Sequence, residues 1–212
     1  MTTIAVFGAT GYSGGNVATE ASARGHRVIA VARNTDPLAG RSDLDVRPGS
    51  LFDENFVRDV ASDSDILVVA LQAHGTGLAD YIPTLGRIAS ENTVRLSLVG
   101  GAGNLRVSHD GPRVLDTPLF PEEFREDGNA HAAVMAQLRA LPDDVDWFSL
   151  SPPAVYNADN RGTRTGTFRV GDDVLLVDAE GNSHIGGEDY AIAFVDEIEK
   201  PTRHRTVFTV AY

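Results

Sequence analysis

The sequence Ile4-Ala5-Val6-Phe7-Gly8-Ala9-Thr10-Gly11-Tyr12-Ser13-Gly14 decides the fold. An apolar run stops at Gly8, two more glycines follow at three-residue spacing, and a helical pattern begins after them. This pattern predicts a buried strand, a tight turn and a helix N-terminus. The open amides of such a turn and the positive end of the helix dipole form a seat for a pyrophosphate. The stretch therefore predicts a dinucleotide site.

The residues that follow complete a strand–helix–strand unit. The apolar run from Arg27 to Ala32 predicts a second buried strand, and alanines recur at helical spacing between Asn16 and Arg24. Gly25 suits the C-terminal cap of this helix. The unit from Thr3 to Arg33 has the length of the first half of a Rossmann fold.

Strand and helix patterns alternate along the rest of the chain. We expect further strands at 44–46, 65–71, 93–99, 146–150 and 206–210, and helices at 53–61, 78–90, 122–141 and 188–199. A small hairpin is expected from 167–170 and 174–178. The irregular stretch 107–121 is expected to be a functional loop or lid. This alternation predicts an α/β fold with a mostly parallel, doubly wound Rossmann-type sheet. We expect a single NAD(P)-binding domain over residues 1–212, with a core at 1–153 and a small C-terminal substrate lobe and final strand at 154–212.

Composition and charge narrow the classes of partner. The chain has 212 residues and no cysteine, which fits one domain without disulfides, thiolate metal sites or a cysteine nucleophile, and we expect no metal. Its 18 basic and 30 acidic residues give a net charge of −12, which repels nucleic acid and anionic membranes. The first apolar run lacks a basic lead, and no run approaches the length of a membrane span. We expect a cytoplasmic monomer or small homo-oligomer that acts on a small molecule.

The predicted cofactor site is made of the glycine turn and the ends of the strands. Gly8 permits the turn, Gly11 lets the backbone approach a phosphate, and Gly14 lets the helix pack on the sheet. The turn also offers the side chains of Thr10, Tyr12 and Ser13 to the ligand. The other cofactor-binding residues follow predicted strands: Asn34, Ser50, Leu51, Ala70, Leu71, Gln72, Gly100, Gly101 and Pro152. Gly101 is expected near the nicotinamide.

Arg33 indicates which dinucleotide is bound. An acidic residue at the end of the second strand would accept a hydrogen bond from the adenosine ribose and disfavour a 2′-phosphate. Arg33 stands there instead, and its guanidinium can pair with that phosphate and stack on adenine. Arg41 is close enough in sequence to assist. The pattern favours NADP(H) and leaves NAD(H) open.

The acid that this fold commonly uses to reduce a carbonyl is missing. That acid is a tyrosine with a lysine four residues later, and none of the five tyrosines has such a lysine. Lys200 is the only lysine among the 18 basic residues. Two alternatives remain: a redox acceptor such as a flavin, for which solvent can supply the proton, or a protein that binds the cofactor without turnover.

Two residues are candidates for catalysis. His131 lies on a predicted helix among small residues, and Tyr156 follows a pair of prolines after the sixth strand. His74, after the fourth strand, is a weaker candidate. Arg161 and Arg164 can grip an anionic acceptor such as a flavin phosphate.

Several stretches together resemble a known family. They are Ile4 to Gly14, Gly25 to Asn34, Leu98 to Asn104, Asp116 to Phe124, Asp146 to Pro153, Arg164 to Phe168, Leu175 to Ser183, Glu188 to Ala193 and Phe208 to Tyr212. The chain resembles the atypical short-chain dehydrogenase/reductases of the NmrA-like group, and within it the small bacterial NADH-flavin reductases, which are related to biliverdin reductase B. Family members commonly carry arginine where Arg33 stands, whereas biliverdin reductase B has serine in place of Gly101.

The resemblance implies a Rossmann core, a C-terminal substrate lobe and reduction of flavin-like acceptors, with flavin as a substrate rather than a prosthetic group. We therefore expect an NAD(P)H-dependent oxidoreductase that passes hydride to a flavin or similar conjugated acceptor. Two alternatives stay open. One is a non-catalytic NADP-binding redox sensor, and the other is an epimerase or ketoreductase with a nonstandard acid such as His131.

Overall fold

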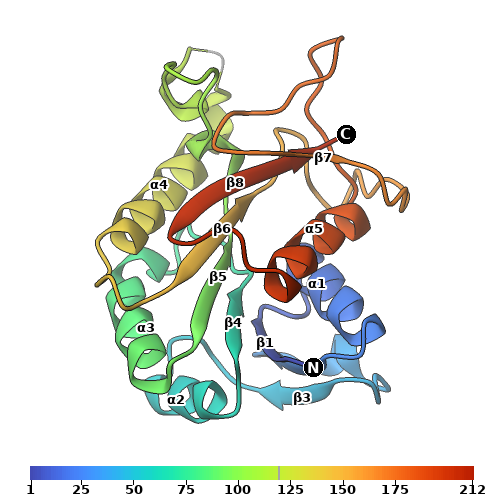
Figure 1. The fold of residues 1–212 in the computed structure, drawn as a ribbon, viewed down its shortest axis with the longest axis vertical. Coiled ribbons are helices and arrows are strands. Elements are labelled where there is room, and N and C mark those ends of the chain that lie inside the picture. Colours follow the sequence, from blue (N-terminus) through green and yellow to red (C-terminus); the bar gives the residue numbers. More distant parts are fainter. Residues whose placement is uncertain (119) are drawn as a thin grey trace.

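The structure is a computed structural model that describes residues 1–118 and 120–212, and within them an eight-stranded sheet forms the centre of the molecule (Figure 1). The strand order is β3-β2-β1-β4-β5-β6-β8-β7. All neighbouring strands run parallel except β7, which is antiparallel to β8. The order 3-2-1-4-5-6 is that of the Rossmann fold, so the predicted fold class is confirmed.

Apart from the hairpin predicted at 167–178, the predicted strands and helices are present with small shifts of their ends. The strands are β1 (Thr3–Phe7), β2 (Arg27–Ala32), β3 (Asp45–Pro48), β4 (Ile66–Val69), β5 (Arg95–Val99), β6 (Trp147–Ser151), β7 (Arg169–Gly171) and β8 (Thr206–Ala211). The helices are α1 (Tyr12–Ala23), α2 (Glu54–Ser62), α3 (Leu78–Asn92), α4 (Arg125–Arg139) and α5 (Gly187–Glu199). Short 3-10 turns are η1 (Asp36–Leu38), η2 (Ala102–Asn104), η3 (Val114–Asp116) and η4 (Glu122–Phe124).

Helices cover both faces of the sheet. One apolar core lies under α2, α3 and α4, and a second lies under α1 and α5 (Figure 1). The central strands read as continuous apolar runs because both of their faces are buried. Among the described residues, no helix combines the length and apolar composition that crossing a bilayer requires.

The turn after β1 depends on glycine at two positions. Gly8 has φ +90°, and a Cβ there would lie 2.3 Å from the carbonyl oxygen of Ala70 at the end of β4. A Cβ on Gly14 would lie 2.3 Å from the Gly8 carbonyl oxygen. The amides of Gly8 and Ala9 donate to the Val31 carbonyl over 3.0 and 3.2 Å, which ties the turn to β2. These close contacts place the start of α1 directly above the ends of β1 and β4.

The predicted hairpin from 167–170 and 174–178 is wrong. Its first half forms β7, which pairs with β8 at the edge of the main sheet. In its second half, Leu175 donates to the carbonyl of Arg106 over 2.9 Å, and the Arg106 amide donates to Asp173 over 2.7 Å. Each half therefore finds a distant partner: the open backbone edge of β8 takes the first, and the segment after η2 takes the second.

Two other boundaries differ from expectation. The helix predicted at 122–141 begins as the turn η4, and α4 itself starts at Arg125. The predicted lid at 107–121 contains η3, and its residue 119 lies outside the described residues. Residues 154–212 contribute α5, β7 and β8 to the same sheet and helix layers as the core. The role of this part in binding a substrate stays a prediction.

Candidate cofactor and acceptor site

A cavity of about 410 Å³ opens at the carboxyl ends of β1, β2, β3 and β4. It is lined by Phe7, Gly8, Thr10, Val31, Ala32, Arg33, Gly49, Ser50, Leu51, Phe52, Leu71, Gln72, Gly75 and Thr76. The structure thus brings together seven of the predicted cofactor residues: Gly8, Thr10, Arg33, Ser50, Leu51, Leu71 and Gln72. This is the position at which Rossmann sheets bind the adenosine half of a dinucleotide.

Arg33 projects into this cavity with an exposed side chain. Among the described residues, no carboxylate lies within 4.0 Å of its guanidinium, whereas most other arginines of this acidic chain are paired. Asn34 is turned toward the backbone, where its side-chain oxygen accepts from the Asp36 amide over 2.9 Å. The guanidinium of Arg33 is therefore free to pair with a phosphate.

Arg41 does not assist Arg33. Its guanidinium makes two hydrogen bonds to Asp43, of 2.8 and 2.7 Å, and it borders a different hollow from the one that holds Arg33. The hydrogen bonds from Arg41 outweigh partial desolvation and hold the pKa of the Asp43 carboxyl well below its usual range.

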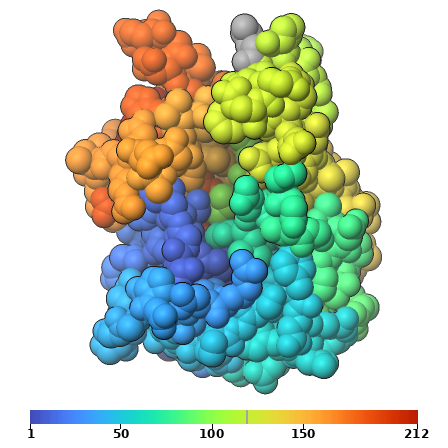
Figure 2. All heavy atoms as spheres, turned by 180° about the vertical axis from the view of Figure 1, so that it is seen from behind, coloured from blue at the N-terminus to red at the C-terminus, as the bar shows by residue number. Residues whose placement is uncertain are grey.

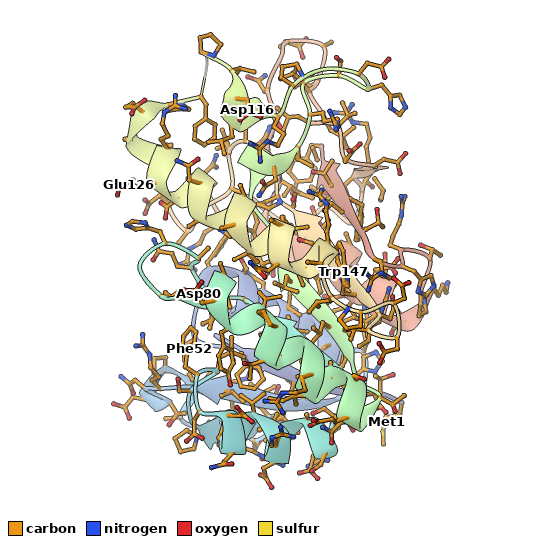
Figure 3. The ribbon with its side chains drawn as sticks, turned by 90° about the vertical axis from the view of Figure 1, so that its left-hand side faces the viewer. Met1, Phe52, Asp80, Asp116, Glu126 and Trp147 are labelled. Carbon is orange, nitrogen blue, oxygen red and sulfur yellow. The ribbon has the colours of Figure 1, made fainter. Side chains whose placement is uncertain are left out.

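Phe52 is a wall of the cavity that the sequence reasoning missed. Its ring is 41% exposed and packs edge-on against Tyr81, with ring centroids 5.4 Å apart. Figure 3 shows Phe52 beneath the start of α3, where Asp80 is labelled. The Ser50 hydroxyl accepts from the Phe52 amide over 3.2 Å and so fixes this turn. A flat apolar ring opposite a free arginine fits an adenine base.

The start of α1 fits a pyrophosphate. Gly11 is its N-cap and makes no side-chain cap hydrogen bond, and its first turn carries no acidic residue. The first amides of a helix have no partner within the helix. Among the described residues, no side chain accepts from these amides, so the amides of Tyr12, Ser13 and Gly14 can donate to phosphate oxygens.

A second group of predicted residues lies outside the adenosine cavity, at the carboxyl ends of β5 and β6. A Cβ on Gly101 would lie 3.1 Å from Cγ of His131, so the imidazole of α4 packs directly against this glycine. A Cβ on Gly100 would lie 2.6 Å and 2.8 Å from the hydroxyls of Ser151 and Ser149. Both hydroxyls are buried without a hydrogen-bond partner among the described residues. Pro152 is buried directly after β6.

The surroundings of His131 keep its ring neutral. Burial lowers the pKa of this imidazole, and the nearby carboxylate of Asp127 only partly opposes the effect. Near neutral pH, His131 is therefore a hydrogen-bonding group rather than a cation.

Tyr156 is the centre of a cluster of tyrosines. Its ring lies 5.1 Å from that of Tyr12 and 4.6 Å from that of Tyr190. Its hydroxyl is buried and makes no hydrogen bond of good geometry to any described residue. Burial raises the pKa of this phenol well above its usual value, and the neighbouring Ser13 side chain offsets the rise only in part. Tyr156 therefore stays protonated near neutral pH.

Between these two groups of residues, the surface is hollowed. Figure 2 shows the hollow where the N-terminal turn, the segment after β4, the start of α4 and the loop after β6 meet. Ala70 lies between the two groups, in contact with Gly8 and Gly14. The Nε2 of His74 lies 3.4 Å from a carboxylate oxygen of Glu126.

The two arginines predicted to grip an acceptor differ in the structure. Arg164 donates to the buried carboxylate of Glu20 over 2.5 and 3.2 Å, so it is already paired. No carboxylate lies within 4.0 Å of Arg161 among the described residues, and its Nε donates to the Ala158 carbonyl.

The only lysine lies far from these residues. Lys200 follows α5 at its C-terminal end, and the preceding Glu199 bonds to His26, just before β2 begins. Lys200 is therefore at the edge where the strands start, whereas the site is at the edge where they end. Tyr12, Tyr190 and Tyr212 each use their hydroxyl in a hydrogen bond to the protein.

Comparison with known proteins gives the family. The sequence model of the NAD(P)H-binding family matches residues 8–181. The Bacillus subtilis protein YwnB is 33% identical over 215 residues, which covers 98% of this chain and 97% of that protein. A structure from Streptococcus pneumoniae, called a "putative NADH-flavin reductase", is 28% identical with a TM-score of 0.87 and covers 100% of this chain and 99% of its own.

A third similar protein carries a different name. A structure from Bacteroides thetaiotaomicron, called a "putative epimerase", is 30% identical with a TM-score of 0.90 and covers 100% of this chain and 97% of its own. The match to the family and the likeness to proteins of the same length agree with the fold and with the glycine turn. The chain belongs to the NAD(P)H-binding family, as an atypical, NmrA-like member of the short-chain dehydrogenases/reductases.

Proposed function

We propose that this protein is an NAD(P)H-dependent reductase that favours NADP(H) and passes hydride to a flavin or a similar flat, conjugated acceptor. One observation carries the proposal. Seven of the residues predicted to bind a dinucleotide line one cavity at the ends of β1 to β4, while the chain's only lysine is at the opposite edge of the sheet. A reductase built in this way suits an acceptor that needs no strong acid from the protein.

Each part of the site has a role in this proposal. The amides at the start of α1 hold the pyrophosphate, and Arg33 holds the 2′-phosphate. When bound, the reduced nicotinamide supplies a hydride. The imidazole of His131 packs against Gly101, and His131 and Tyr156 border the acceptor on two sides.

The proton that accompanies the hydride comes from solvent in this account. Both bordering side chains stay neutral near pH 7, since burial raises the pKa of Tyr156 and lowers that of His131. The ring of Tyr156, whose hydroxyl is buried, forms a wall that orients the acceptor, and the ring of His131 contacts the edge of the acceptor. The cytoplasm, where reduced cofactor is produced, is the compartment that the proposal requires.

The name of the S. pneumoniae protein supports a flavin acceptor, and that of the B. thetaiotaomicron protein favours a second candidate. This is an epimerase or ketoreductase in which His131 acts as the acid. It draws on the contact of His131 with Gly101, which places a titratable ring beside the expected nicotinamide.

The test is steady-state oxidation of NADPH by the purified protein with FMN, FAD, riboflavin or small ketones as acceptor. The proposal expects turnover with at least one flavin and none with the ketones. His131→Phe keeps an aromatic ring and removes the titratable nitrogens. The reductase should retain most of its flavin activity in this variant, whereas a ketoreductase that uses His131 would lose its activity.

A third result of the same assay would point to regulation. Tight binding of NADPH without oxidation by any acceptor would refute the reductase and support a non-catalytic redox sensor. In that case, the next measurement is the capture of protein partners by the NADP-bound and the NADPH-bound protein. A redox sensor should capture a partner in only one of these two states.

A further inference from the structure

Unpaired arginines are rare in this acidic chain and mark positions where an anion can bind. Among the described residues, most guanidinium groups have a carboxylate within 4.0 Å. Four do not: Arg33, Arg139, Arg161 and Arg169. Arg33 lines the adenosine cavity, Arg169 bonds to the carbonyl of the last residue, and Arg139 lies where the strands begin. Of these four, Arg161 is the one that contacts Tyr12, whose ring in turn contacts Tyr156.

The backbone of Arg161 is fixed next to the start of α1. Its carbonyl oxygen accepts from the Tyr12 hydroxyl over 3.3 Å and from the Gly187 amide over 3.3 Å. Its Nε donates to the Ala158 carbonyl over 2.9 Å. Among the described residues, Nη1 and Nη2 have no hydrogen-bond partner, so the outer side of the guanidinium is available to a ligand.

The charge of Arg161 acts at the site. Burial raises the pKa of the Tyr12 phenol, and the positive charge of Arg161 is one of the influences that oppose this rise. The carboxylate of Glu188 acts on the same phenol in the opposite direction. The charges of Arg161 and Glu188 therefore both act on Tyr12. Arg161 attracts an anion bound beside this tyrosine, and Glu188 repels it.

The loop that carries Arg161 is held in place by its neighbours. Arg164 is bound to Glu20, and burial of that carboxylate is outweighed by the two arginines around it, Arg164 and Arg24, which lower its pKa. Asp189 accepts hydrogen bonds from the amides of Thr165 and Gly166 over 2.9 Å each. Such a loop presents Arg161 with little loss of conformational entropy on binding.

We propose that Arg161 forms a subsite for the terminal phosphate of the acceptor, so that the preferred acceptor is a phosphomonoester such as FMN rather than riboflavin. The inference rests on the proposed reductase function. The rings of Tyr156 and Tyr12, which contact each other at an interplanar angle of 49°, lead from the expected nicotinamide to Arg161. A ring system placed beside Tyr156 can extend its sugar-alcohol chain along Tyr12 and reach the guanidinium with its phosphate.

The first test compares FMN and riboflavin as acceptors for Arg161→Ala. The KM for FMN should rise roughly tenfold, the usual effect of losing a hydrogen bond between charged groups, while kcat and the constants for riboflavin stay near those of the wild type. Arg139→Ala removes an equally unpaired arginine at the opposite edge and should leave both acceptors unaffected. An equal change for FMN and riboflavin would overturn the proposal.

A variant that removes a negative charge near Tyr12 should have the opposite effect on the KM for FMN. Glu188→Gln removes the carboxylate that faces Tyr12 and should lower the KM for FMN without changing that for riboflavin. If Arg161→Ala instead raises the KM for NADPH with every acceptor, the guanidinium binds the pyrophosphate of the cofactor, and the acceptor subsite is refuted.

The proposal can fail separately from the reductase function. Binding of FMN and riboflavin to the NADP-loaded protein is measured by quenching of flavin fluorescence, which needs no turnover. A preference for FMN that Arg161→Ala abolishes supports the phosphate subsite even if no hydride is transferred. Equal binding of the two flavins contradicts it even if both are reduced.

Discussion

Gly8 has a left-handed backbone conformation directly against the end of β4, and it combines two constraints that Gly14 and Gly25 carry singly. Its φ is +90°, and a Cβ would lie 2.3 Å from the Ala70 carbonyl oxygen. Gly25 also has a positive φ, of +82°, but a Cβ there would have no heavy atom within 4 Å. A comparison of Gly8 with Gly25 therefore distinguishes the effect of backbone strain from that of a steric clash.

We expect Gly8→Ala to destabilise the protein by several kcal/mol and Gly25→Ala by about 1 kcal/mol, because only the former adds a backbone clash to the strain of the left-handed conformation. Chemical denaturation of the two variants measures the difference. Similar losses of stability in both would show that the turn can relax away from β4.

Arg33 is tested by its effect on the two cofactors. Arg33→Ala should weaken NADPH binding roughly 10- to 100-fold, the effect of losing charged hydrogen bonds to the 2′-phosphate, and should change NADH binding little. Arg41→Ala is the matched control, because Arg41 is bound to Asp43 and borders another hollow. Equal weakening of NADPH and NADH would refute the assignment.

Local sequence patterns place a residue correctly where its position depends on its own strand or turn. The placement of Gly8 and Arg33 follows from the first strand–helix–strand unit alone. Such patterns fail where a side chain binds a partner distant in sequence, or a neighbouring carboxylate that the pattern does not reveal. Arg41 is taken by Asp43, Arg164 by Glu20 far along the chain, and Phe52 enters the cavity through a turn with no regular pattern.

At the scale of elements, α5 fastens the loop between β6 and β7. Asp189, in the first turn of α5, is fully buried and accepts from Thr165, Gly166 and the hydroxyl of Tyr212. Burial raises the pKa of this carboxyl, but the hydrogen bonds from Thr165, Tyr212 and Gly166 outweigh it and lower the pKa overall. The charged form therefore stabilises the folded state.

The sign of the resulting pH dependence follows from this shift. A carboxyl whose pKa is lowered by folding stabilises the protein above its unfolded pKa and loses that effect as pH falls through the folded value. Asp189→Asn should lower the free energy of unfolding by about 2 to 4 kcal/mol at pH 7. Denaturation curves should converge with those of the wild type below about pH 4. A difference that stays constant down to pH 3 would contradict this role.

The wrongly predicted hairpin shows the limit of local patterns for elements. Two short apolar runs separated by Asp172 and Asp173 resemble a hairpin, yet β7 pairs with the last strand of the chain. The edge of β8 exposes unpaired backbone groups, and covering them stabilises the sheet more than an isolated two-stranded hairpin would. The central parallel strands are continuous apolar runs, so the sequence predicted their place in the sheet correctly.

At the scale of the whole molecule, the chain replaces lysine with arginine almost throughout, and its one lysine is outside the site. Lys200→Gln should therefore leave NADPH oxidation within about twofold of the wild type, since Lys200 lies at the opposite edge of the sheet. Steady-state kinetics with the best flavin measure this. A loss of activity beyond tenfold would mean that the lysine takes part in the reaction, and the account of a missing acid would be wrong.

The central claim is that the glycine turn holds a cofactor whose hydride passes directly to a flat acceptor. Its most direct test is single-turnover reduction of FMN without oxygen, using NADPH that carries deuterium at the transferred position. The account predicts that one flavin is reduced for each NADPH oxidised, and that the deuterium slows this step. Bound NADPH that leaves FMN oxidised, or reduction at a rate the protein does not change, would contradict it.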